Sequence, residues 1–175
     1  TNVSKQFKNT SVQVGLRVEQ TNSTGNLITN NEVVDRSYWD FFPTFYLQQT
    51  LSKNNQVGFS YSRRIDRPSY DALNPFVYYL DEFTYNKGNP FLNPQYTHNF
   101  EVSYTFMQKY MLSVNYSRVN DVITEVILPD ESKKALFQTN ANLAKNISYG
   151  ANLNVPDRVF KWWNKNNNFN VVHLS

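Results

Sequence analysis

The sequence predicts an all-β protein: an antiparallel transmembrane β-barrel, present only in part, as about seven strands of a larger barrel. Apolar and polar residues alternate with a period of two along most of the 175 residues, as in strands whose two faces meet different surroundings. Short turns and long loops alternate between these strands, which is typical of transmembrane β-barrels. Aromatic residues make up 16% of the chain, yet its mean hydropathy is negative and its longest apolar run has five residues. Such short runs exclude a transmembrane helix, which needs about 20 apolar residues.

Four strands are predicted in the first part of the chain. In each of them an apolar or aromatic residue occupies nearly every second position, with Asn, Ser, Thr, Gln or Gly between. They cover about ten residues from near Val12 and then residues 38–51, 57–65 and 97–106. The predicted connections are a long loop at 21–37, a short polar turn at 52–55 and a very long loop at 68–96.

Three further strands are predicted after the tight turn at 108–109. The first runs from Tyr110 to about Ile127. Residues 135–155 keep one phase of alternation throughout, which predicts a single strand of about 20 residues that could cross a bilayer even when tilted. The last strand begins near Asn166. The predicted connections between them lie at 129–133 and 156–165.

The polar face of these strands carries mainly uncharged residues. A water-soluble sheet usually exposes many charges, whereas the inside of a membrane barrel is polar and its apolar face meets lipid. The pattern therefore favours a membrane barrel with the lipid bilayer as its partner. The same alternation would arise in a soluble β-sandwich or barrel that binds carbohydrate through an aromatic loop, and this alternative stays open here.

Aromatic residues gather near the predicted strand ends. Membrane barrels carry girdles of aromatic side chains at both interfaces, where amphipathic rings prefer to lie. We therefore predict two groups of membrane-interface residues, with the alternative that the two tryptophans fill a hydrophobic corner. The groups are Tyr38, Trp39 and Phe41 at one end, and Phe106, Tyr110, Trp162 and Trp163 at the other.

The loop at 68–96 contains four prolines, three of them preceded by Asn, and eight aromatic residues. Asn-Pro steps favour turns and keep the backbone out of helical conformations. Long loops without regular structure are usually functional or disordered. The rings and prolines favour a folded loop with a small core of its own.

This region also carries a family resemblance. The segments Arg63–Tyr70, Leu73–Phe76 and Gly88–Pro94, followed by Asn99-Phe100-Glu101, resemble the barrel of TonB-dependent outer-membrane receptors. Among them the chain is most similar to the outer-membrane β-barrel family common in Bacteroidetes. The run Gly-Asn-Pro-x-Leu-x-Pro entering a strand is the most specific part, and residues 115–123 and 149–153 extend the resemblance from about Val12 to Trp163.

The resemblance implies an outer-membrane location in a Gram-negative bacterium and TonB-dependent uptake of a nutrient ligand. Such receptors have about 22 strands around a plugged lumen. The TonB complex would act through a plug domain that residues 1–175 do not contain, and a surface lipoprotein is a further partner that the resemblance allows. We expect the whole chain to be one piece of a barrel domain, with 68–96 as an extracellular loop.

Five residues of the loop are the candidate ligand contacts. Tyr and Asn side chains could stack on or hydrogen-bond a sugar, a siderophore or a peptide. The alternative is that the rings pack the loop against its neighbours. The candidates are Tyr70, Tyr78, Tyr79, Tyr85 and Asn86.

No enzyme site is predicted. His98 and His173 are the two histidines, the chain has no Cys, and no nucleophile or metal-ligand spacing involves them. Five glycines form no phosphate-binding pattern, so no cofactor is expected. A net charge of +3 without a basic cluster argues against nucleic acid.

Overall fold

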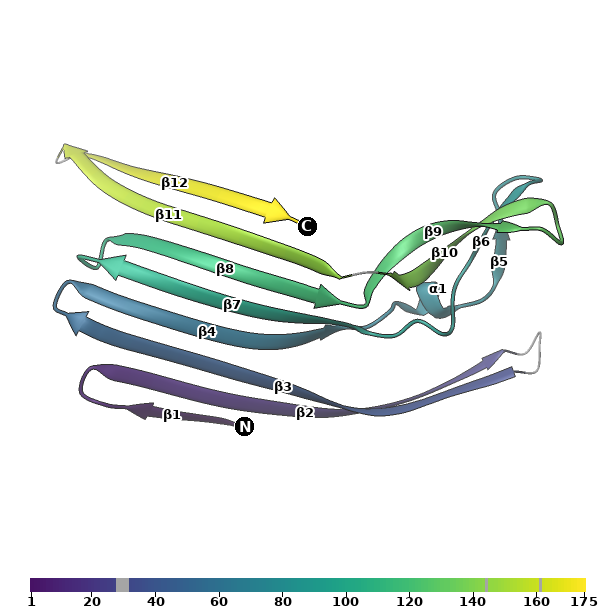
Figure 1. Cartoon of the computed structure of the whole chain (residues 1–175), viewed down its shortest axis with the longest axis horizontal. Helices are drawn as coiled ribbons and strands as arrows, with labels where there is room; N and C mark the ends of the chain where they lie inside the picture. The colour runs from purple at the N-terminus through teal and green to yellow at the C-terminus, as the bar shows by residue number, and fades with distance from the viewer. Residues whose placement is uncertain (28–31, 144, 161) are drawn as a thin grey trace.

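The computed structural model describes residues 1–27, 32–143, 145–160 and 162–175. These residues form an eight-stranded antiparallel sheet and a separate four-stranded sheet at one end of it (Figure 1). The strands of the large sheet are, in spatial order, β1 (Asn2–Gln6), β2 (Thr10–Leu27), β3 (Glu32–Ser52), β4 (Asn55–Asp66), β7 (Gln95–Phe106), β8 (Tyr110–Asn120), β11 (Asn146–Phe160) and β12 (Trp163–Leu174).

Short turns join the strands of the large sheet at the end on the left of Figure 1, and the longer connections gather at the opposite end. The predicted turns at 52–55 and 108–109 are confirmed by the β3–β4 and β7–β8 hairpins. Met107 and Gln108 have φ values of 54° and 53°, and Lys109 N–H donates to the Phe106 carbonyl at 3.0 Å. The left-handed pair therefore reverses the chain within three residues.

The small sheet joins two connections that are far apart in sequence. Its strands are, in order, β5 (Val77–Tyr79), β6 (Thr84–Lys87), β10 (Ala135–Leu143) and β9 (Val122–Asp130), and the one-turn helix α1 (Tyr70–Leu73) lies beside them. β6 and β10 pair in parallel, with Phe137 opposite Tyr85. The predicted loop at 68–96 is thus folded against the β9–β10 hairpin.

The prediction of one strand over 135–155 is wrong. β10 pairs with β9 and β6 in the small sheet, whereas β11 pairs with β8 and β12 in the large one. The predicted strand from Tyr110 to Ile127 divides in the same way, because Asp121 has a φ of 57° between β8 and β9. The period of two along 135–155 did not reveal its break, because each half is itself a strand.

Three boundaries also differ from prediction. The expected loop at 21–37 is mostly the outer part of the β2–β3 hairpin, whose register runs to the Leu27–Glu32 pair. The short strand β1 precedes the first predicted one. The expected connection at 156–165 is largely strand, since β11 continues through Pro156 to Phe160 and β12 begins at Trp163.

The large sheet is a single layer whose two faces have opposite chemistry. Among the described residues the buried hydrophobic side chains are Phe42, Tyr85 and Leu92, while Val102 and Val114 in the sheet centre are 49% and 51% exposed. Among the described residues, no second sheet covers the apolar face (Figure 1). Within the described residues, no helix has both the length and the apolarity to cross a bilayer.

The register of the large sheet pairs polar residues with polar residues and apolar residues with apolar residues in two adjacent rows. One paired row is polar and runs through Ser11, Gln48, Gly58, Ser103, Ser113, Asn152 and Asn170. The row beside it is apolar and runs through Val12, Leu47, Phe59, Val102, Val114, Ala151 and Val171. Because neighbouring rows point to opposite faces, one face of the sheet is mainly polar and the other mainly apolar, apart from Arg63, His98 and Arg118 near the loop end.

Candidate functional site at the loop end of the sheet

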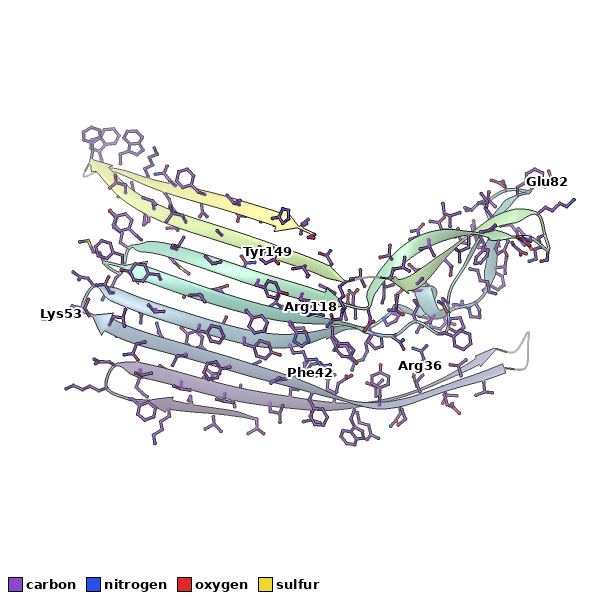
Figure 2. All side chains as sticks on the ribbon, viewed as in Figure 1. Arg36, Phe42, Lys53, Glu82, Arg118 and Tyr149 are labelled. Carbon is purple, nitrogen blue, oxygen red and sulfur yellow. The ribbon has the colours of Figure 1, made fainter. Side chains whose placement is uncertain are left out.

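The candidate site begins where β3 separates from β4. The two strands pair from the turn only as far as Thr44 and Ser62, and beyond that point β3 continues with β2 alone. Side chains bridge the gap instead of backbone hydrogen bonds. Figure 2 shows Arg36 on this outer part of β3, on the side of the small sheet. Its guanidinium donates to the carbonyls of Pro90 and Leu92, so the proline-rich segment is attached to the hairpin.

A buried carboxylate forms the centre of the bridge. Asp40 is only 3% exposed, and its Oδ1 accepts a hydrogen bond from the Tyr96 hydroxyl at 2.7 Å. Its Oδ2 has no hydrogen-bond partner among the described residues and lies 3.7 Å from Arg67 Nη2. Arg67 also donates to Glu19 at 2.9 Å and to Thr21 at 3.0 Å. The network therefore ties the end of β4 and the start of β7 to the β2–β3 hairpin.

Two further arginines pack on aromatic rings beside this network. Arg63 lies 4.4 Å from the Tyr96 ring centre and donates to the Phe41 carbonyl at 3.0 Å. Arg17 lies 4.6 Å from the ring centre of the buried Phe42. Such stacking adds a cation–π attraction, and Arg17 also forms an ion pair with Glu19 at 3.3 Å. The hydrogen bond that Glu19 accepts raises the pKa of Arg67, which stays charged.

A groove of about 830 Å³ lies between the hairpin and the segment that enters β7. Arg36, Asp40, Phe91 and Tyr96 are among its lining residues. It combines aromatic rings with both signs of charge, which suits a ligand with polar groups on an apolar frame. Nothing in the sequence pattern identifies this groove, because it depends on where β3 leaves β4.

A second pocket lies within the small sheet and has a volume of about 380 Å³. Tyr78 and Asn86 face each other across the β5–β6 pair and both line it, together with Asp71 and Glu125. Asn86 Oδ1 is buried without a hydrogen-bond partner among the described residues. An amide oxygen in that position is available to a donor on a ligand.

The other predicted contacts lie elsewhere. Tyr79 and Tyr85 pair on β5 and β6, with ring centres 5.7 Å apart. Tyr85 is 4% exposed, stacks on Phe137 at 5.6 Å and donates to Asp130 at 2.6 Å, so its side chain packs the small sheet. Tyr70 on α1 is 78% exposed and outside the pocket lining. Sequence reasoning missed Asp71 and Glu125, since the long-range pairing of β6 with β10 brings their segments together.

The predicted interface aromatics lie at both ends of the large sheet. Trp39 and Phe41 are 60% and 51% exposed, and Tyr38 stands beside Arg67. At the turn end Phe106 and Tyr110 stack at 6.3 Å, and Trp162 and Trp163 stack at 6.4 Å. Their contact with a membrane interface stays a prediction. The register adds a paired row that the sequence analysis missed: Phe45, Tyr61, Phe100, Tyr116 and Tyr149.

The described residues hold no group of three or more His, Asp or Glu side chains arranged for a metal ion. His98 lies on the apolar face, where its Nδ1 is 3.0 Å from the Tyr61 hydroxyl.

Residues 1–175 match the family model described as "Outer membrane protein beta-barrel family". No curated protein matches the chain in sequence. The siderophore receptor PirA from Pseudomonas aeruginosa is similar in structure, with a TM-score of 0.77 and 15% identity over 99% of this chain. The hemophore receptor HasR of Serratia marcescens matches with a TM-score of 0.62 and 15% identity over 87% of this chain. The FrpB iron transporter from Neisseria meningitidis matches with a TM-score of 0.62 and 14% identity over 99% of this chain. This chain spans 34%, 30% and 24% of their lengths, respectively.

Proposed function

Because this chain belongs to the outer membrane protein beta-barrel family, a family of Gram-negative outer membranes, we propose that it forms part of the wall of a TonB-dependent receptor. The receptor imports a nutrient ligand and is not an enzyme. The single observation that carries the proposal is the paired register, which gives eight strands one polar and one apolar face. A polar lumen and a lipid-facing exterior need that division.

The ligand would approach from the loop end. In outer-membrane barrels the short turns are periplasmic and the long loops extracellular, so the groove and the small-sheet pocket face outward. Tyr78, Asn86, Arg36 and Tyr96 are the proposed contacts. Iron carriers and heme are the candidate ligand classes, because PirA is a siderophore receptor and HasR was solved in complex with its hemophore and heme. The TonB complex would act through a plug domain outside residues 1–175, and a surface lipoprotein remains a proposed partner.

Uptake measurements test this proposal. The full-length receptor is expressed in a host that lacks its own receptors, with and without a functional TonB complex. Radiolabelled ferric enterobactin and heme serve as iron probes, and maltoheptaose tests a sugar ligand. We expect uptake of one probe that requires both the receptor and the TonB complex. Equal uptake without TonB, or no uptake of any probe despite correct outer-membrane assembly, would contradict the proposal.

A pair of substitutions tests the two faces directly. Val102 lies in the apolar row of β7, and its neighbour Ser103 lies in the polar row. An arginine on the lipid face near the bilayer midplane costs about 2–4 kcal/mol, whereas the lumen tolerates it. Val102→Arg should reduce heat-modifiable, outer-membrane-assembled receptor severely, and Ser103→Arg should leave it near the parent level. The reverse order would refute the assignment of the faces.

A further inference from the structure

Three basic residues form a cross-strand row on the apolar face of the large sheet. His98 on β7 is paired directly with Arg63 on β4 and with Arg118 on β8. All three are partly exposed, and Figure 2 shows Arg118 near the loop end of β8. Neighbouring strands are about 4.8 Å apart, so the Cα atoms of the two arginines are about 10 Å apart with the histidine between them. Two long side chains can converge on one small anion across that distance.

Contacts along this face show that the basic row borders the aromatic row. The Tyr61 hydroxyl is 3.0 Å from His98 Nδ1, and the Tyr61 and Phe100 ring centres are 4.8 Å apart. Phe100 is in turn 6.0 Å from Tyr116. Toward the turns, the same face continues into the apolar row that contains Val102. The order along the strands is therefore two arginines with a histidine, then aromatic rings, then the row of Phe59, Val102 and Val114.

Among the described residues, no carboxylate forms an ion pair with this row. The outward positions of residues 55–66, 95–106 and 110–120 include no Asp or Glu. Arg63 donates to a backbone carbonyl and Arg118 donates to Asn120 Oδ1 at 3.1 Å, but neither forms an ion pair with a described residue. On the opposite face, by contrast, Arg17 is paired with Glu19 at 3.3 Å. Within the described part of the chain, the two arginines of this row therefore have hydrogen-bond partners but no carboxylate partner.

We propose that Arg63, His98 and Arg118 bind the phosphate group of a lipid headgroup in the outer leaflet of the membrane. The guanidinium fork matches phosphate geometry and donates several hydrogen bonds at once. Aromatic side chains of membrane barrels mark the interface, and the loop end faces outward, so the row lies at headgroup level in the outer leaflet. The acyl chains of the same lipid would lie over the aromatic and aliphatic side chains below. This continuity favours a lipid over free phosphate.

The proposal depends on the membrane position of the sheet and not on the identity of the transported ligand. Its test uses the full-length receptor in phosphatidylcholine nanodiscs, with monophosphoryl lipid A as the probe and native mass spectrometry as the readout. Each basic residue near a charged lipid surface contributes about fivefold in affinity, so Arg118→Gln should bind the probe about fivefold less tightly. Arg118→Lys should keep most of the affinity because it keeps the charge.

Arg64 provides a matched control, because it is adjacent to Arg63 on β4 but pairs with Thr97 on the opposite, polar face. Arg64→Gln should bind the probe as the parent does. Lipid A with its phosphate removed should bind the parent and Arg118→Gln equally well. Heat-modifiable migration verifies that each variant is folded. Unchanged binding by Arg118→Gln, an equal loss in Arg64→Gln, or equal competition by inorganic phosphate would overturn the proposal. Uptake by these variants is read separately, so failure of the lipid site and failure of the transport proposal are distinguishable.

Discussion

Removal of one hydroxyl group tests whether the Asp40 network holds the outer β2–β3 hairpin in place. Tyr96→Phe keeps the ring on which Arg63 stacks and deletes only the donor to Asp40 Oδ1. Asp40 is 3% exposed and its Oδ2 has no other hydrogen-bond donor among the described residues. Arg67, 3.7 Å away, would then be its remaining polar contact within the described residues.

A hydrogen bond to a charged group contributes about 1.5–3 kcal/mol, and each 1.4 kcal/mol is about tenfold in an opening equilibrium. Beyond Thr44 the hairpin is a two-stranded ribbon, which is only marginally stable unless it is docked. Loss of the Tyr96 hydroxyl should therefore increase amide hydrogen exchange in residues 33–40 between about tenfold and about a hundredfold. The measurement is hydrogen-exchange mass spectrometry on the full-length receptor in nanodiscs.

Tyr104→Phe is the matched control, because Tyr104 lies on the same strand and donates to Asn55 at the turn end. It should leave exchange in residues 33–40 unchanged. In an Asp40→Asn background the effect of Tyr96→Phe should shrink to the 0.5–1.5 kcal/mol typical of a neutral bond. If amide hydrogen exchange in residues 33–40 rises less than about threefold in Tyr96→Phe, where at least about tenfold is expected, the hydrogen bond from Tyr96 to Asp40 does not anchor the hairpin. An equal effect in the control would lead to the same conclusion.

The remaining predictions concern the small sheet. A Cβ on Gly88 would lie 2.2 Å from the Asn74 carbonyl oxygen, so Gly88→Ala should destabilise the loop by about 1–3 kcal/mol and speed limited proteolysis there. Gly25→Ala is the control and should have neither effect, because the nearest atom to its Cβ would be 3.8 Å away. The hydrogen bond to Asp130 and burial raise the pKa of Tyr85 to about 12, so its contribution to loop stability is complete below pH 10 and lost as the pH rises through 12. An absorbance titration of tyrosinate should show one late group near 12 that moves toward 10 in Asp130→Asn; no late group in the parent would contradict the assignment. Hydrogen bonds from Ser132 and then Tyr85 lower the Asp130 pKa to about 2. The contribution of Asp130 to the stability of the small sheet is therefore present above pH 3.8 and lost as the pH falls through 2. Amide hydrogen exchange in residues 130–138 would report this loss.

Much of the large sheet was predictable because its strands alternate strictly. The alternation along 97–106 assigned the faces of β7. The short turn before β4 and the short turn after β7 identified β3–β4 and β7–β8 as antiparallel neighbours. The candidate site was predictable only in part. Tyr78 and Asn86 line one pocket, whereas Tyr85 packs the small sheet and Tyr70 lies apart. Local pattern does not say which ring on a strand pair faces a cavity, because the partner β10 is about 50 residues away along the chain.

The sequence by itself determined the fold class, the two faces of the sheet and the end at which the long connections lie. These features follow from a period of two and from turn residues, which are local properties of the chain. Only the tertiary structure decided that 135–155 divides between two sheets, that β3 leaves β4 beyond Thr44, and that Arg63, His98 and Arg118 share one row. The physical reason is register: pairing between distant strands sets which side chains become neighbours, and alternation within one strand is the same for every register.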